Sequence, residues 1–118
     1  MLTIVPAGEE RRQQLARRFA CHGAQGMIAR AGKEELGVGA YVLEGETLRL
    51  LELAAQDSLL LDGLLRAVLN AGQRAGAKRA ACSVASLAAF LQEEGFLPGP
   101  DGYGVELSAF FARPCRGG

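Results

Sequence analysis

The chain has 118 residues, a hydrophobic content of 49% and a formal net charge of zero from 13 basic and 13 acidic residues. This length predicts a single domain over residues 1–118, and the apolar content is enough for one sizeable core. The balanced charge argues against the strongly basic surface with which proteins hold nucleic acids or anionic membranes. We therefore expect neither a nucleic-acid partner nor a membrane partner.

The cysteines and the apolar runs indicate the compartment. Cys21, Cys82 and Cys115 are odd in number and far apart, which argues against a disulfide framework. No apolar run approaches the ~20 residues of a membrane span. Glu9 and Glu10 follow the first apolar residues too soon for a signal peptide. The sequence thus predicts a cytoplasmic protein with three free thiols.

The first half of the chain predicts a short strand, a helix and an antiparallel meander. The helix has acidic residues in its first turn and arginine pairs at 11–12 and 17–18, which we interpret as a solvated helix face rather than a basic patch. Gly37 and Gly39 indicate either close packing of a helix or a bulge. The expected bounds are strand 2–5, helix 9–20 and strands 26–31, 36–43 and 47–55, with turns at 32–34 and 44–46.

The second half predicts a long helix between two strands. Helix 60–76 has one polar stripe, and leucine and valine cover most of its remaining surface, so more than half of it should be buried. Gly72 costs ~1 kcal/mol relative to alanine inside a helix, and close packing on the sheet explains it best. Strand 78–84 follows, which gives a βαβ unit with parallel pairing and a right-handed crossover.

The last third predicts a short helix and the end of the sheet. Ser86 is a suitable N-cap for helix 87–94, which Gly95 ends. A strand begins at 96–97, a turn spans 98–102, and strand 103–107 is the last, with 108–111 as a cap on the sheet. The fold class is therefore α/β, a mixed sheet of about six strands with about three helices. The tail 112–118 has no assigned role.

Residues 56–65 read Gln-Asp-Ser-Leu-Leu-Leu-Asp-Gly-Leu-Leu. They resemble the acetyl-CoA signature of the GCN5-related N-acetyltransferase (GNAT) superfamily, Gln/Arg-x-x-Gly-x-Gly/Ala followed by a leucine pair. Gln56 takes the first position and Leu64-Leu65 the pair, whereas Leu59 and Leu61 replace the two glycines. Residues 37–41, 74–77 and 95–96 add to the resemblance, which covers roughly 26–107. It implies a small GNAT-like (acyl-CoA N-acyltransferase-like) domain with a degenerate signature.

The resemblance implies a place for acetyl-CoA. In GNAT enzymes the strand before the signature splays from its neighbour, pantetheine binds along its backbone, and the pyrophosphate sits on loop amides at the helix start. Bulky leucines, with Asp57 and Asp62, should hinder the pyrophosphate, so we expect acetyl-CoA binding to be weak or absent. A weakened site and a loop that only caps a buried helix remain open alternatives. The implied cofactor-binding residues are Leu53, Ala54, Gln56, Asp57, Ser58, Leu59, Leu60 and Leu61.

The resemblance also points to candidate catalytic residues. Leu91 stands where the family has the tyrosine that acts as general acid, and it has no proton to give. Glu52 is the one carboxylate of strand 47–55, so it is the candidate general base; an exposed place beside Arg49 is the favoured alternative. Cys21 and His22 are adjacent, so their side chains point about 100° apart and rarely form a nucleophile pair. The spacing of one histidine and three cysteines fits no metal site.

The expected function is an N-acetyltransferase-like protein that transfers an acyl group from acetyl-CoA to a small-molecule or protein amine, with catalysis reduced or lost. One alternative is a non-catalytic module on the same scaffold that binds a small ligand or a partner. Another is a subunit of a homodimer whose function lies in assembly. Many GNAT proteins have two helices between their first two strands, in the region that shapes the acceptor site. Only one fits here.

Overall fold

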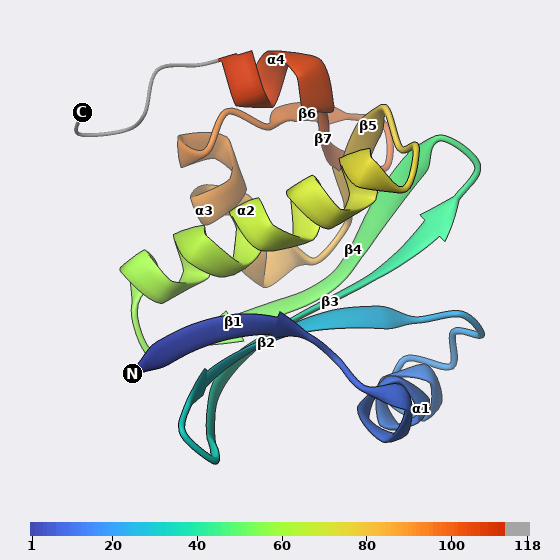
Figure 1. Ribbon diagram of the computed structural model, residues 1–118. Helices are drawn as coiled ribbons and strands as arrows, with labels where there is room; N and C mark the ends of the chain where they lie inside the picture. The colour runs from blue at the N-terminus through green and yellow to red at the C-terminus, as the bar shows by residue number, and fades with distance from the viewer. Residues whose placement is uncertain (113–118) are drawn as a thin grey trace.

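The computed structural model describes residues 1–112, which form one seven-stranded sheet with helices on both faces (Figure 1). The strand order is β1-β2-β3-β4-β5-β7-β6, and only the pairing of β4 with β5 is parallel. The elements are β1 (Leu2–Pro6), α1 (Glu9–Arg18), β2 (Gln25–Ala31), β3 (Glu34–Glu44), β4 (Thr47–Ala55), α2 (Ser58–Arg74), β5 (Arg79–Cys82), a 3-10 turn (Ala85–Leu87), α3 (Ala88–Glu93), β6 (Leu97–Gly99), β7 (Gly102–Glu106) and α4 (Leu107–Ala112).

The mixed α/β sheet and its parallel βαβ unit confirm the predicted fold class, with more elements than expected. The described chain has seven strands and four α-helices, against the expected six and three. The strand expected to begin at 96–97 is β6, Leu97–Gly99, which pairs with β7 across a tight turn and brings the count to seven. The added helix is α4, because the apolar run after β7 buries Leu107 and Phe110 and closes into helical turns.

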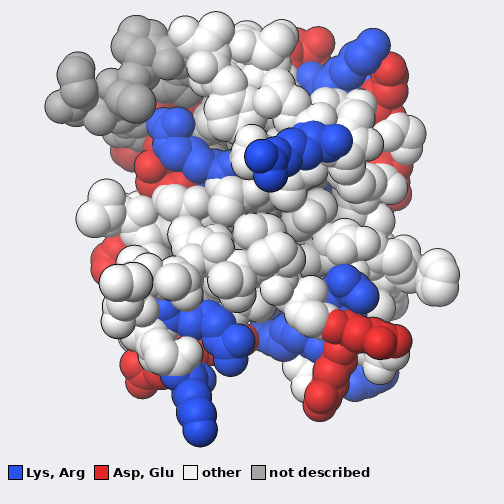
Figure 2. Space-filling view, in the orientation of Figure 1, with Lys and Arg blue, Asp and Glu red and all other residues white. Residues whose placement is uncertain are grey.

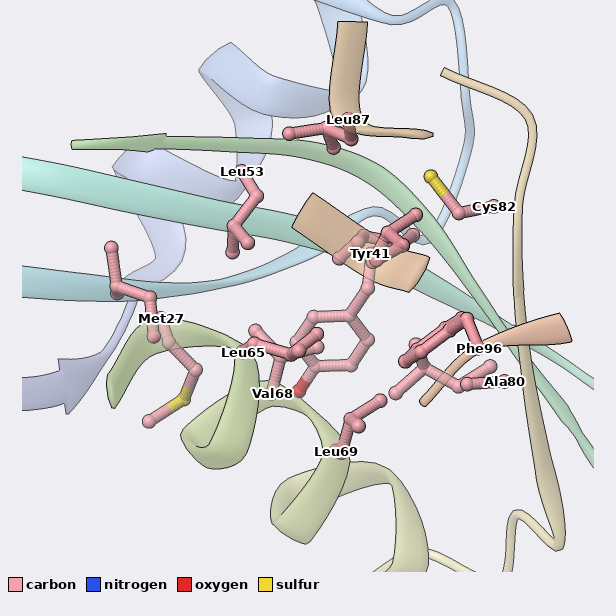
Figure 3. Packing of buried hydrophobic residues seen from close by; sticks show 14 of the residues in the cluster. Met27, Tyr41, Leu53, Leu65, Val68, Leu69, Ala80, Cys82, Leu87 and Phe96 are labelled. Carbon is pink, nitrogen blue, oxygen red and sulfur yellow. The ribbon is translucent and has the colours of Figure 1, made fainter. Parts of the chain in front are cut away.

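The two faces of the sheet carry separate apolar clusters. The larger cluster joins α2, α3 and α4 to the sheet, and Figure 3 shows leucine and valine side chains of α2 gathered around Tyr41 of β3. The smaller cluster lies under α1, where Leu15 is fully buried against residues of β2 and β3. Most of the buried apolar surface therefore belongs to the α2 face, and burial of such surface is the main stabilising term.

Glycines let α2 lie close to the two central strands. A Cβ on Gly39 would be 2.8 Å from Val68 Cγ2, and one on Gly37 would be 2.9 Å from Leu64 Cδ1. A Cβ on Gly72 of α2 would overlap Leu48 Cδ1 of β4. These contacts confirm that the glycines serve close helix packing. The bulge alternative also holds at Gly37, because the β2–β3 register shifts there and leaves Leu36 as an extra residue in β3.

Several predicted boundaries were wrong; among the strands, β5 spans Arg79–Cys82 rather than 78–84. Helix α1 ends at Arg18 rather than Ala20, because Ala20 adopts a φ of 48° and the Cys21 N–H bonds back to Ala16 O at 2.9 Å. Helix α2 spans 58–74 rather than 60–76, since Asp57 caps it. Ser86 is not an N-cap: it lies inside a 3-10 turn that the Leu87 N–H closes on Val84 O.

Replacing Gly72 with alanine should destabilise the protein, whereas the same change at Gly63 of the same helix should not. Alanine gains about 1 kcal/mol of helix propensity at either position. At Gly72 the new methyl group meets Leu48, which is fully buried, and overpacking a filled core costs about 1–3 kcal/mol. At Gly63 its nearest neighbour is Ile4 Cδ1 at 3.3 Å, on an edge strand that can shift. Urea unfolding measures both free energies. A Gly72→Ala variant more stable than Gly63→Ala would contradict the close packing of α2.

Candidate functional site

The parallel strands β4 and β5 separate partway along the sheet. β4 pairs with β5 only from Thr47 to Leu50, while β4 itself continues to Ala55. The register shift opposite Ala40 leaves Leu51 as an extra residue in β4, and a bulge of this kind bends a strand. β5 ends at Cys82, where the chain leaves the sheet. This separation is the splay that the family resemblance implies.

On the α2 side of the sheet, leucine side chains from β4 and from the 3-10 turn after β5 are packed next to the place where the two strands separate. Leu53 of β4 and Leu87 of the 3-10 turn belong to the same buried cluster, with 5% and 8% of their surfaces exposed (Figure 3). Leu53, one of the predicted cofactor-binding residues, is therefore a core residue. Ala54, the next of them, is exposed. The backbones of β4 and β5 are therefore separated beyond Leu50, and apolar side chains pack on the α2 side of this separation.

The turn between β4 and α2 consists of Gln56 and Asp57, both exposed. Asp57 is the N-cap of α2: its Oδ1 accepts a hydrogen bond from the Leu60 N–H at 2.8 Å. Its main-chain oxygen accepts another from the Leu61 N–H at 3.1 Å. A carboxylate thus takes an amide that the family signature offers to a phosphate. The residues at this turn do not fit a pyrophosphate as that signature does.

The two leucines that replace the signature glycines lie in different surroundings. Leu59 has 82% of its surface exposed, whereas Leu61 is partly buried and packs against the main cluster. Leu59 stands at the rim of a groove of about 270 Å³ between α2 and α3. The groove also has carboxylates in its wall, and Asp62 Oδ2 there accepts from Arg66 Nε at 3.1 Å. Its lining residues are Ser58, Leu59, Asp62, Phe90, Glu93 and Glu94.

Glu52 is paired with an arginine from the opposite layer. Arg18 of α1 donates from both terminal nitrogens to the two Glu52 carboxylate oxygens, each at 2.8 Å. The guanidinium also lies 5.0 Å from the centre of the Phe19 ring. The favoured alternative, an exposed glutamate beside Arg49, was wrong: Arg49 pairs with Glu44, and the Glu52 side chain is 22% exposed. Both oxygens of the candidate base already accept hydrogen bonds from a cation.

The other candidate residues are placed as follows. Leu91 is fully buried, so the family's general-acid position belongs to the core here. The Cys21 thiol donates to the main-chain oxygen of His22, with Sγ and O 3.9 Å apart. It does not bond to the His22 imidazole, so the two side chains form no nucleophile pair. Burial raises the pKa of the Cys82 thiol, and a hydrogen bond from the Val84 backbone partly offsets this. Cys21 and Cys82 are free thiols, whereas Cys115 and the tail after Ala112 lie outside the described residues.

Residues 1–112 contain neither a metal-binding cluster nor a membrane-spanning helix. No three or more histidine, cysteine, aspartate or glutamate side chains in this range are grouped so that they could hold a metal ion. No helix in the same range is both long and apolar enough to cross a membrane.

The chain resembles known proteins in its fold but not detectably in its sequence. No protein-family model matches the sequence, and no curated protein matches it significantly. Solved structures do match. A GNAT-family protein from Desulfovibrio desulfuricans gives a TM-score of 0.72 at 15% identity, with 91% of this chain and 99% of that chain covered.

Two further structures extend the comparison. The ribosomal-protein-S18-alanine N-acetyltransferase from Escherichia coli gives a TM-score of 0.68 at 14% identity and covers 91% of this chain and 94% of its own. A GNAT-family acetyltransferase from Elizabethkingia anophelis with acetyl-CoA bound gives 0.67 at 16% identity, covering 83% and 77%. The match extends over nearly the whole chain while sequence identity stays low. The chain therefore has the fold of the GNAT acetyltransferases, as its altered signature predicted.

Proposed function

We propose that this chain is a non-catalytic binding module on a GNAT scaffold, in which acetyl-CoA binding is weak or absent. The observation that carries the proposal is the Asp57 carboxylate at the start of α2. A helix start attracts an anion because its first amides lack partners and because the helix dipole is positive there. Asp57 supplies both an acceptor and a negative charge at this place. A pyrophosphate would have to displace the carboxylate and remain beside its charge.

The candidate acid and base support the same proposal. Acyl transfer to an amine needs a group that accepts the proton of the amine, and a general base must have a free lone pair within reach. The Arg18 guanidinium engages both oxygens of Glu52. Leu91, at the acid position, has no ionisable group and no exposed surface. An ion pair at one position and an aliphatic side chain at the other support a module without catalysis.

The second candidate function is a CoA-dependent N-acyltransferase that acts on a small-molecule or protein amine. The observation in its favour is the β4–β5 split, which this chain keeps. Gln56, the first signature residue, is also present and exposed. This candidate requires that CoA binds at the split despite the Asp57 cap, so a CoA-binding measurement separates the two functions.

Removing the Asp57 side chain should strengthen CoA binding. We expect no saturable heat from CoA with the wild type below millimolar concentration. In Asp57→Gly, with or without Leu59→Gly, affinity should rise at least about tenfold, which corresponds to about 1.4 kcal/mol. The variant loses one like charge and frees the Leu60 N–H, and glycine at an N-cap costs the helix only a few tenths of a kcal/mol, roughly. Isothermal titration calorimetry measures the change.

The matched control is Asp101→Gly, which removes the same charge from the exposed β6–β7 turn and should leave CoA binding unchanged. Release of free CoA thiol from acetyl-CoA, with a panel of primary amines, is the second readout. The acyltransferase would be favoured, and the module refuted, by two results together. The wild type would bind CoA at micromolar concentration and Asp57→Gly would weaken that binding. Release of CoA thiol from acetyl-CoA would depend on the added amine.

Restoring the family's tyrosine at Leu91 should destabilise the protein rather than create activity. The Leu91 side chain is fully buried, and adding a ring and hydroxyl to a filled core costs about 1–3 kcal/mol. Gln92→Tyr, at the next and exposed position of α3, should stay within about 0.5 kcal/mol of wild type. Urea unfolding of the two variants provides the comparison. Equal stabilities, with faster thiol release by Leu91→Tyr, would show that position 91 faces a working site.

A further inference from the structure

The two edges of the sheet differ in how they are protected. Exposed edge strands invite pairing with other chains, and proteins discourage it with short strands, prolines or charges. The edge strand β6 has only three residues, and Pro98 is the middle one. The edge strand β1 at the other side reads Leu-Thr-Ile-Val-Pro, has no charged residue and pairs only with β2. β1 is therefore the open edge.

The register shows which backbone groups of β1 lie on that edge. β1 pairs with β2 in one unbroken antiparallel register, and the next residue, Ala7, donates its N–H to Gly26 O at 2.9 Å. The N–H and C=O of one residue point to the same side of a strand, and they alternate along it. Thr3 and Val5, in phase with Ala7, therefore bond to β2. Leu2 and Ile4 direct their N–H and C=O groups to the open edge.

We propose that two copies of this chain pair through β1, antiparallel, about a two-fold axis at Thr3. Leu2 then lies opposite Ile4 of the partner subunit, and these residues exchange both backbone hydrogen bonds. By symmetry every free N–H and C=O of Leu2 and Ile4 is paired. Thr3 faces Thr3 of the partner subunit at a position without backbone bonds, where threonine pairs are favourable.

Pro6 selects this register over its neighbour. If the axis passed through Ile4, Leu2 of the partner subunit would lie opposite Pro6. Pro6 is in phase with Ile4, so its ring stands on the open edge where an N–H would be, and it would push the facing strand away. With the axis at Thr3, Pro6 lies beyond the paired residues. The strand is thus complementary to itself in one register, which is why a second copy is the occupant.

The exposed apolar side chains beside β1 also favour pairing with a second copy of the chain. Leu2 has 52% of its surface exposed and Leu59 has 82%. α2 and β1 run in the same direction (Figure 1). Gly63 of α2 lies close to Ile4 of β1. Leu59, one helical turn before Gly63, is therefore on the side of α2 nearer to the start of β1. Figure 2 shows a band of mostly uncharged side chains across the middle of this face, with charged side chains above and below it. Pairing covers the exposed apolar surface of Leu2 there.

Sedimentation equilibrium tests the pairing. The wild type should approach twice the chain mass of 12.4 kDa as concentration rises. Leu2→Lys places a charge in the contact and should give the monomer mass, with its thermal unfolding midpoint at or near that of a wild-type sample diluted to monomer. The matched control is Leu97→Lys: this leucine is 70% exposed on β6, and its replacement should leave the dimer intact.

Cross-linking tests the register, with Cys21→Ser and Cys115→Ser as the background. The two Thr3 Cα atoms should lie about 4.5 Å apart, within the range of a disulfide. Thr3→Cys should therefore form a covalent dimer on oxidation. Val5→Cys, on the same face of the strand, should not, because two such residues lie about 14 Å apart in this register.

The proposal is overturned if the wild type keeps the monomer mass up to millimolar concentration. It is also overturned if Leu97→Lys rather than Leu2→Lys removes the dimer. Efficient cross-linking through Val5→Cys but not through Thr3→Cys refutes the proposed register and, with it, the two-fold axis at Thr3.

Discussion

The seating of α2 on β3 and β4 is the contact on which the rest of the structure depends. It needs three glycines, because a side chain at Gly37, Gly39 or Gly72 would meet the facing leucine or valine. α2 also contributes most of the fully buried aliphatic side chains of the main cluster. A helix held this closely cannot slide along the sheet. Its first turn is therefore fixed beside the end of β4, where the splayed strand and the helix start meet.

At that fixed helix start, a side chain of the protein itself occupies part of the place that the family resemblance gives to a phosphate. An anion and an N-cap carboxylate satisfy the same unpaired amides, so either can complete the helix. Here Asp57 does so within the chain, with its oxygen 2.8 Å from the Leu60 nitrogen. One of the first amides of α2 is thereby satisfied by the protein itself. Leu53 and Leu87 likewise complete the core behind the split.

On the opposite face, the candidate base is also engaged by a side chain of the protein itself. Glu52, on the central strand, would be costly to leave unpaired beside an apolar cluster, and Arg18 of α1 satisfies it with two charge-assisted hydrogen bonds. The single helix between β1 and β2 is thereby tied across the sheet to β4. At the open edge of β1, the N–H and C=O groups of Leu2 and Ile4 have no neighbouring strand to pair with.

Local pattern was enough to determine the strands and helices, the burial of α2, the role of its glycines and the likeness to the GNAT fold, because periodicity and short motifs act between neighbouring residues. The N-caps of α2 and α3, Asp57 and Leu87, were missed, since competing caps differ by little energy. Only the tertiary structure decided the surroundings of the candidate site residues. The pairing of Arg18 with Glu52, the burial of Leu91 and the place of β7 between β5 and β6 join residues far apart in the chain, and such contacts exist only after the layers have packed.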